Sequence, residues 1–213
     1  MKIYFDYAAT TPIDPLVLKT MKPYFSEKFG NPSSLHSFGQ EAMAVIDESR
    51  GKIAKAINAN FREIIFTGSA TEANNLALRG IVKKYETFNK DYNAQNFAPR
   101  IIVSSIEHKS ILETCHDLEK QGIEVIYLPV NRNGIVDLKK LEKALNEQTI
   151  LISIMYANNE IGTIQPILKI SEIIKKFKIQ NTKSEKNNFE LTDGLPLFHT
   201  DAVQAFQYLN CNV

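Results

Sequence analysis

Strand-like and helix-like segments alternate along this chain, and that alternation limits the folds it can adopt. Residues 149–155 form an almost continuous apolar run, which is typical of a strand buried on both faces of a sheet. Residues 40–59 and 167–177 place their apolar side chains at helical spacing. Because parallel strands need crossover connections between them, the pattern predicts an α/β architecture with a mainly parallel central sheet and helices on both faces.

The remaining elements follow from shorter apolar runs and from turn-forming residues. Gly122 stands where a helix C-cap would, Asn133 and Gly134 mark a turn, and Asp137 can cap the helix that follows. We expect further helices over residues 15–25, 71–85, 109–121 and 137–146, and short strands over residues 3–5, 63–67, 100–104, 123–128 and 196–200.

The composition narrows the range of partners and compartments. The 213 residues carry a formal net charge of +1, so no global field would recruit nucleic acid or an anionic membrane. No apolar run approaches the ~20 residues that span a bilayer, and the N-terminus lacks a signal-peptide pattern. Cys115 and Cys211 lie far apart and form neither a disulfide framework nor a metal cluster. These features predict a cytoplasmic protein without a metal site.

One stretch differs from the rest in composition. Residues 178–194 are dominated by Asn, Lys, Ser, Glu and Asp. Such a polar segment cannot bury enough apolar surface to pack, so we expect a surface insertion that ends at about residue 195.

Two motifs stand where a strand would give way to a helix. In residues 66–72, Ser69 and Thr71 precede a helix whose N-terminal N–H groups could bind a phosphate, although either residue could simply cap the helix. In residues 104–110, His108 follows a strand and opens a helix, at the strand end where ligands bind in α/β sheets. His108 could stack on an aromatic ring or transfer protons, or it could be an ordinary loop histidine.

Two further motifs follow predicted strands. Asn158, Asn159 and Glu160 come directly after the buried strand and could hydrogen-bond a polar ligand or form a turn. Asp201 ends an apolar strand, where a carboxylate is costly unless it meets a cation or hydrogen-bond donors. The protonated ring nitrogen of pyridoxal phosphate is one such partner, and a capping role on the next helix is the alternative. Each signal is weak alone, but one sheet edge could gather all four around one aromatic phosphate.

Six motifs in this order resemble the NifS/IscS-type cysteine desulfurases of the class V aminotransferase group. They are YFDYAATTP from Tyr4, FGNPSS from Phe29, TGSATEANN from Thr67, EHKS from Glu107, NNEIGTIQP from Asn158 and HTDAVQ from His199. The resemblance implies a pyridoxal-phosphate-dependent transferase of fold type I, similar to aspartate aminotransferase. It also implies that residues 1–15 belong to the small domain or active-site arm, and that residues 16–213 form an incomplete large cofactor-binding domain.

The resemblance also implies roles for individual residues. The backbone of Ala70 and the hydroxyl of Thr71 match positions that hold the cofactor phosphate. His108 matches the histidine that stacks on the pyridine ring and transfers protons. Asp201 matches the partner of the ring nitrogen.

Two more positions match the family's cofactor site. Asn159 matches a residue near the ring hydroxyl and the substrate, and Gln204 matches the donor to the ring hydroxyl oxygen. The family's Schiff-base lysine follows in a Ser-x-His-Lys-like motif that does not occur within these 213 residues. The sulfur-accepting cysteine and the substrate-binding arginine are also expected outside them. We interpret Cys115 and Cys211 as structural, because nothing local would lower the pKa of either thiol.

The resemblance implies an enzyme that converts L-cysteine to L-alanine and passes the sulfur to an active-site cysteine as a persulfide, for iron–sulfur cluster or thio-cofactor synthesis. It implies a homodimer with a sulfur-acceptor or scaffold protein as partner. We expect the 213 residues alone to be inactive, and to leave a sheet edge and apolar surface exposed. Alternatives are another class V enzyme, such as a selenocysteine lyase or a transaminase, and a non-catalytic short form that acts as a binding partner.

Overall fold

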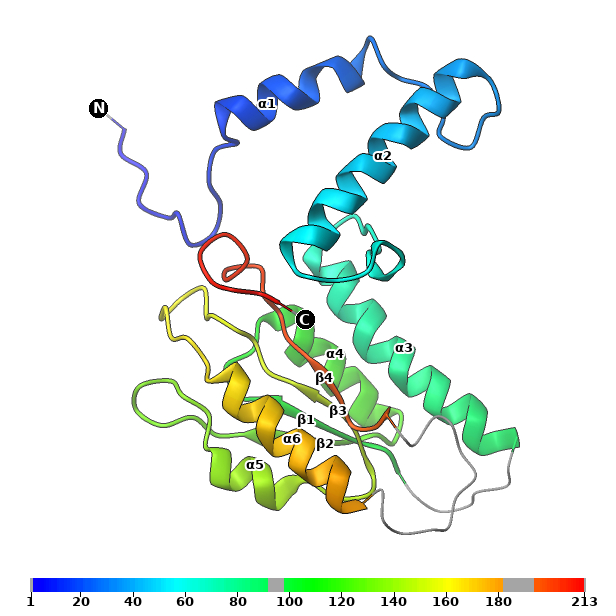
Figure 1. Ribbon diagram of the computed structural model, residues 1–213. Helices are drawn as coiled ribbons and strands as arrows, with labels where there is room; N and C mark the ends of the chain where they lie inside the picture. The colour runs from blue at the N-terminus through cyan, green and yellow to red at the C-terminus, as the bar shows by residue number, and fades with distance from the viewer. Residues whose placement is uncertain (1, 92–97, 182–193, 213) are drawn as a thin grey trace. The chain divides into compact units, whose positions relative to one another are not determined.

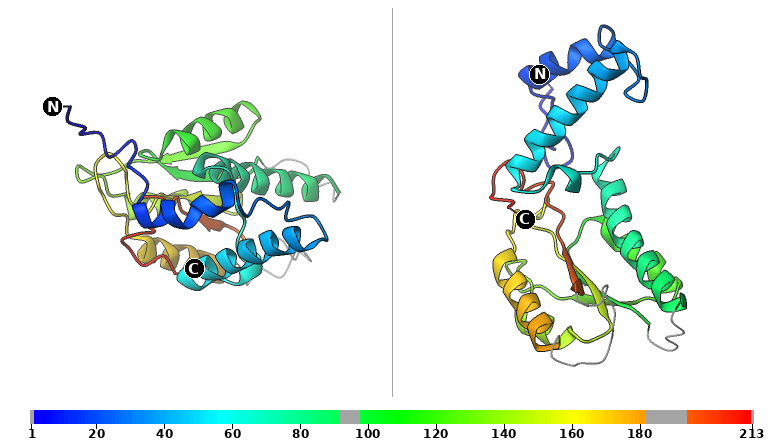
Figure 2. Two further views of the ribbon diagram at one scale, coloured as in Figure 1. Left: turned by 90° about the horizontal axis from the view of Figure 1, so that it is seen from above. Right: turned by 45° about the vertical axis from the view of Figure 1, so that its right-hand side comes forward.

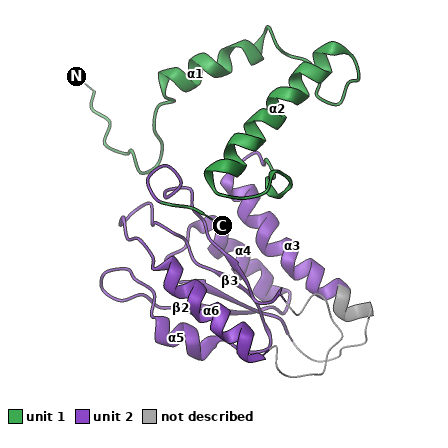
Figure 3. Cartoon of the chain, viewed as in Figure 1, with its two compact units in different colours: residues 1–66, 210–213 green, residues 67–209 purple. Residues whose placement is uncertain are grey.

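The computed structural model describes residues 2–91, 98–181 and 194–212 (Figure 1). The chain divides into two compact units, one of residues 1–66 and 210–213 and one of residues 67–209 (Figure 3). This division is based on the contacts that these 213 residues make with one another. The assignment of residues 1–15 and 16–213 to two domains of a larger enzyme stays a prediction.

The first unit consists of helical elements. They are α1 (Pro15–Met21), the 3₁₀ turn η1 (Lys22–Phe25), α2 (Ser37–Ala56) and the 3₁₀ turn η2 (Phe61–Glu63), of which α2 is the longest. Asp14 caps α1 by accepting from the backbone N–H groups of Leu16 and Val17. Gly39, in the first turn of α2, is required by a close approach, because a Cβ there would lie 2.1 Å from the Ser34 carbonyl oxygen.

The second unit is built on a four-stranded parallel sheet. Its strands are β1 (Arg100–Ser104), β2 (Glu124–Leu128), β3 (Thr149–Ser153) and β4 (Leu197–His199), in the spatial order β2-β1-β3-β4. All three pairings are parallel, which confirms the prediction of a parallel sheet. Its helices are α3 (Ala70–Asp91), α4 (Lys109–Lys120), α5 (Leu138–Ala144) and α6 (Ile167–Asn181).

Helices cover both faces of this sheet (Figure 2). Alternate residues of β1 point to opposite faces: Ile101 and Val103 pack with α3 and α4, whereas Ile102 packs with α5 and α6. The central strand β3 is buried along its whole length, as its continuous apolar run predicts. The unit is therefore a three-layer α/β sandwich in which α3 and α4 share one face.

Several predicted boundaries are confirmed by local capping. Gly122 adopts a φ of +91° just after α4, a left-handed conformation that suits glycine at a helix C-terminus. Asp137 accepts from the N–H groups of Lys139 and Lys140 and caps α5. Gly134 has a φ of +75° in the expected turn. The strand predicted over residues 149–155 ends earlier, at Ser153.

Two predicted strands are wrong. Residues 3–5 are not a strand; the side chains of Ile3 and Phe5 are 64% and 88% exposed, so no burial drives the segment into a sheet. Residues 63–67 are not a strand either. The Ile64 carbonyl accepts from the Arg50 guanidinium, which also lies over the Phe66 ring, so a side chain takes the place of a neighbouring strand.

The predicted insertion over residues 178–195 is only partly within the described residues. Its first residues, 178–181, continue α6, and the Lys178 Nζ donates to the Gly194 carbonyl oxygen at 2.7 Å. Residues 182–193 lie outside the described part. None of the helices described in residues 2–91, 98–181 and 194–212 is long and apolar enough to cross a membrane.

The core of the second unit supplies a direct test of the fold. Replacing Ile102 by alanine should lower the free energy of unfolding by about 3 kcal/mol, because Ile102 is fully buried in a central strand and the change leaves a cavity. Leu168→Ala is the matched control, since Leu168 is 80% exposed and should cost no more than about 0.5 kcal/mol. Urea unfolding followed by circular dichroism measures both. Equal losses for the two variants would contradict the described packing.

Candidate functional site

The carboxyl ends of β1, β3 and β4 lie together because the three strands are parallel and in register. Val103 pairs with Ser153, and Ser153 pairs with His199. The alignment continues past the last ladder pair, where the Tyr156 N–H donates to the Asp201 carbonyl oxygen at 2.9 Å. The segments 105–108, 154–159 and 200–204 therefore leave the sheet at one edge.

The N-terminus of α3 is capped by its own sequence. The Ser69 hydroxyl accepts from the Glu72 N–H at 3.1 Å, and the Glu72 carboxylate accepts from the Gly68 N–H at 2.7 Å. The capping interpretation is thus confirmed for Ser69. Ala70 is the first residue of α3, and Thr71 follows it.

His108 is fixed at the start of α4. It is the N-cap residue, and its Nδ1 accepts from the Ser110 N–H at 3.1 Å. The Ser110 hydroxyl lies 2.8 Å from the same nitrogen. Two polar groups of one residue thus converge on one ring nitrogen, which sets the orientation of the imidazole.

Asp201 is tied to α3 by a buried amide. The Asn74 Nδ2 donates to the Asp201 carboxylate at 2.9 Å and to the Ser110 hydroxyl at 2.9 Å. Asp201 is half-buried, and its other carboxylate oxygen accepts from the Val203 N–H at 3.1 Å. The strand-end carboxylate predicted to need donors therefore has them, and the chain Asp201–Asn74–Ser110–His108 is continuous.

A second carboxyl group, that of Glu107, is almost fully buried beside this chain. One of its oxygens accepts from the Ser104 hydroxyl at 2.5 Å and from the Met155 N–H at 2.8 Å. Its other oxygen has no partner among the described residues. Burial raises the pKa of the Glu107 carboxyl to about 7, an effect to which the charge of Asp201 adds. Through its hydrogen bonds with Ser104 and Met155, Glu107 connects the end of β1 to the end of β3.

A histidine lies on the neighbouring strand β4. The His199 Nδ1 is 2.8 Å from the Ser153 hydroxyl. Burial lowers the pKa of His199, and the charge of Asp201 opposes that shift. His199 therefore favours its neutral form between the two strands.

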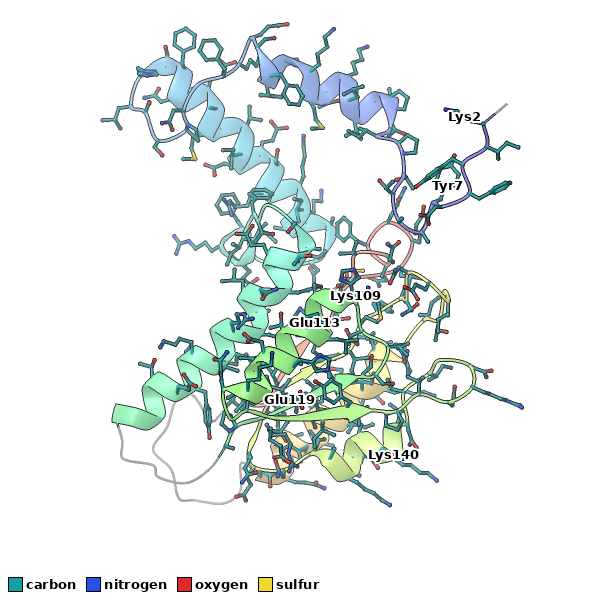
Figure 4. The ribbon with its side chains drawn as sticks, turned by 180° about the vertical axis from the view of Figure 1, so that it is seen from behind. Lys2, Tyr7, Lys109, Glu113, Glu119 and Lys140 are labelled. Carbon is teal, nitrogen blue, oxygen red and sulfur yellow. The ribbon has the colours of Figure 1, made fainter. Side chains whose placement is uncertain are left out.

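An open pocket of about 410 Å³ lies where α3 and α4 begin. Thr71 and His108 both line it. Lys109 and Glu113, which lie along α4, also line it (Figure 4). Its full lining is Thr71, Asn75, Arg79, His108, Lys109, Ser110, Glu113 and Thr114. The pocket combines hydroxyl, amide and cationic groups with the carboxylate of Glu113, so its lining is polar and carries charges of both signs.

Of the six predicted site residues, Thr71 and His108 line this pocket, whereas Ala70, Asn159, Asp201 and Gln204 do not. Asn159 is half-buried in the turn after β3, where its neighbour Asn158 donates to the Ile106 carbonyl oxygen at 2.9 Å. Gln204 is exposed in the turn after Asp201. Their proposed roles stay predictions.

The two cysteines have the properties of structural residues. Cys115 is fully buried, and burial raises the pKa of its thiol to about 12. Burial also raises the pKa of Cys211. Because the thiolate is the nucleophile, neither residue is activated for sulfur chemistry.

Sequence reasoning named Asp201, Thr71 and His108 but missed the residues that connect Asp201 to His108 and the buried Glu107 beside them. Asn74 and Ser110 lie within the TGSATEANN and EHKS motifs, and Glu107 opens the second of these. Their side chains contact residues far away in the sequence, so periodicity alone could not reveal the contacts. Their position inside these motifs was the one feature of the sequence that could have identified them as site residues.

Comparison with known proteins identifies relatives along the whole chain. The family model described as aminotransferase class-V matches residues 3–181. A cysteine desulfurase IscS of Dictyoglomus turgidum is 49% identical over 212 residues, which cover 100% of this chain and 47% of that protein.

Solved structures give the same result. A NifS-like protein has a TM-score of 0.83 and 38% identity, covering 100% of this chain and 52% of the other. A structure described as SspA in complex with cysteine has a TM-score of 0.81 and 37% identity, covering 99% of this chain and 53% of the other. The chain thus spans about half the length of these relatives.

The buried Glu107 predicts a distinctive pH dependence of stability. Its pKa is raised from 4.5 to about 7, so the folded state retains a proton that the unfolded state releases. The free energy of unfolding should therefore fall as pH rises through this window, by up to about 3 kcal/mol. Glu107→Gln keeps a carbonyl oxygen for Ser104 and Met155 but cannot titrate. It should be more stable than wild type at pH 8 and similar at pH 4.5.

The measurement is urea unfolding of both proteins at pH 4.5, 6 and 8. Glu142→Gln, on the exposed surface of α5, controls for the change in net charge. His199 contributes the opposite slope below pH 6.5, because its folded-state pKa is lowered, but it is present in every variant and cancels in the difference. A difference between Glu107→Gln and wild type that does not vary with pH would contradict the prediction.

Proposed function

The chain belongs to the aminotransferase class V family, and on that premise we propose that it forms the cofactor-binding part of a pyridoxal-phosphate-dependent cysteine desulfurase. Its fold is that of the fold type I enzymes to which its structural neighbours belong. The observation that carries the proposal is the hydrogen-bonded chain from Asp201 through Asn74 and Ser110 to His108. This chain joins an oriented carboxylate to an oriented imidazole beside a helix N-terminus.

The donor set fits the parts of pyridoxal phosphate. Asp201 offers a carboxylate to the ring nitrogen, and its bond from Asn74 keeps one oxygen directed. The N–H groups at the start of α3, with the hydroxyl of Thr71, offer donors for the phosphate. His108 would face the ring, and Asn159 and Gln204 would reach the ring hydroxyl and the substrate.

The residues have distinct tasks in this proposal. Bound pyridoxal phosphate supplies an electron sink for the amino acid attached to it. Asp201 keeps the proton on the ring nitrogen, because a nearby carboxylate favours the charged form of that nitrogen. His108 can hold or move a proton at Nε2, since its Nδ1 is already an acceptor for Ser110.

The proposed substrate is L-cysteine, which would leave as L-alanine while its sulfur passes to a cysteine of the enzyme. The name cysteine desulfurase of the IscS relative supports this substrate, as does the cysteine bound in the SspA structure. Neither Cys115 nor Cys211 suits the acceptor role, because burial raises the pKa of both thiols. We place the acceptor in the part of the enzyme that these 213 residues do not include.

The proposed partners follow from the same family. We propose that the complete enzyme is a cytoplasmic homodimer that delivers sulfur to an acceptor or scaffold protein. Exposed apolar side chains such as Phe5, Phe25 and Leu35 in the first unit support an extensive contact surface.

Binding of the cofactor tests the role of Asp201. Pyridoxamine 5′-phosphate is the suitable probe, because it has no aldehyde and cannot react with surface lysines. Asp201→Asn should weaken its binding by about tenfold or more, since the change removes the charge opposite the ring nitrogen. Asp47→Asn, on the exposed surface of α2, is the control. Calorimetric titration measures all three proteins, and equal affinities for the Asp201 variant and wild type would refute the role.

Turnover supplies a separate test. The 213 residues mixed with pyridoxal phosphate and L-cysteine should release no sulfide or alanine above a protein-free control. No Ser-x-His-Lys motif occurs within them, and neither cysteine is activated. The same assay on a known cysteine desulfurase verifies that sulfide and alanine can be detected. Sustained alanine release by this chain would mean that the chemistry needs no residue beyond Val213.

A further inference from the structure

Asn74 is a buried polar residue, and burying a polar side chain is costly unless it forms hydrogen bonds. It is 4% exposed on α3, and its single amide nitrogen meets both Ser110 Oγ and Asp201 Oδ2 at 2.9 Å. The amide carries two hydrogens, so each acceptor receives one. Asp201 lies 127 residues further along the chain, and no local feature of α3 requires this contact.

The direction of these bonds determines the direction of the next one. Because Ser110 Oγ accepts from Asn74, its own hydrogen is free to point at His108 Nδ1, 2.8 Å away. The Ser110 backbone N–H donates to the same nitrogen at 3.1 Å. Two donors on Nδ1 assign it as an acceptor, so the neutral ring carries its proton on Nε2.

Helix packing alone does not account for this network. Among the side chains that the structure describes, the contact between α3 and α4 has two other polar links, the Thr114 hydroxyl to Asn75 Oδ1 at 2.9 Å and the ion pair of Arg79 with Asp117 at 2.8 Å. Neither link reaches Asp201 or His108. The Asn74 amide instead reaches one acceptor on α4 and another after β4, so it links more than the two helices.

We propose that Asn74 and Ser110 are positioning residues that hold Asp201 and the Nε2–H tautomer of His108 in one hydrogen-bonded unit. This inference rests on the proposed function, because Asp201 and His108 are the two residues that the proposal assigns to the cofactor ring. The unit directs a carboxylate toward the ring nitrogen and leaves Nε2 as the one nitrogen of His108 that exchanges protons with a ligand. Orientation of both groups before the ligand arrives lowers the cost of binding it.

Two variants remove different hydrogen bonds of this unit. Asn74→Leu keeps the volume of the side chain and removes both donors, so the Ser110 hydroxyl can turn and Asp201 loses a partner. Ser110→Ala removes only the hydroxyl and retains the backbone donor, so it should fold even if the first variant does not. Asp117→Asn weakens a different link between α3 and α4, the ion pair with Arg79, and is the matched control for helix packing.

The first readout is the tautomer of His108, measured without cofactor by two-bond ¹H–¹⁵N correlation on histidine-labelled protein. His108→Gln identifies the signals among those of the four histidines. Wild type and Asp117→Asn should show an Nε2–H ring. The Nδ1–H form should rise roughly fivefold in Ser110→Ala, as expected for the loss of one hydrogen bond to Nδ1. It should also rise in Asn74→Leu, where the freed Ser110 hydroxyl can accept from an Nδ1–H group.

The second readout is the affinity for pyridoxamine 5′-phosphate, which should fall about tenfold in Asn74→Leu because Asp201 loses a charge-assisted bond. An unchanged His108 tautomer in both Asn74→Leu and Ser110→Ala would overturn the inference. So would a change of equal size in Asp117→Asn. If the tautomer shifts as expected but wild type does not bind the probe, the positioning unit stands and the proposed function fails.

Discussion

Parallel pairing of β1, β3 and β4 is the constraint on which the site depends. It places the segments after the three strands at one edge, and the pairing continues beyond the ladder through the Tyr156 N–H and the Asp201 carbonyl oxygen. Continuous apolar side chains on both faces of β3 fix its place in the middle of the sheet. Because the core determines the register, the polar residues at the strand ends do not have to stabilise the fold themselves.

Two carboxyl groups near this edge have different environments. Asp201 is half-buried and receives hydrogen bonds from Asn74 and from the Val203 N–H. Glu107 is enclosed, and burial raises its pKa to about 7, so near neutral pH it holds a proton for part of the time. Glu107 meanwhile ties Ser104 to Met155, which anchors the loop that carries His108.

The sequence allowed the three-layer architecture and most elements of residues 67–209 to be predicted, because apolar periodicity reports burial directly. It failed at residues 3–5 and 63–67, where short apolar runs have no neighbouring strand and Arg50 satisfies the Ile64 carbonyl. Motifs identified Thr71, His108 and Asp201 as candidates. The contacts of Asn74 could not be predicted, since they join helix α3 to a residue 127 positions away and depend on how the helix packs on the sheet.

The convergence of Asp201, His108 and the start of α3 on one phosphorylated ring is tested most directly by a crystal structure of the chain with pyridoxamine 5′-phosphate. We predict that the ring nitrogen lies within hydrogen-bond distance of the Asp201 carboxylate. The phosphate should lie against the N–H groups of Ala70 and Thr71, and the ring should face His108. A ligand bound elsewhere, or an Asp201 that is separated from Asn74 and directed away from the ring, would contradict this assignment.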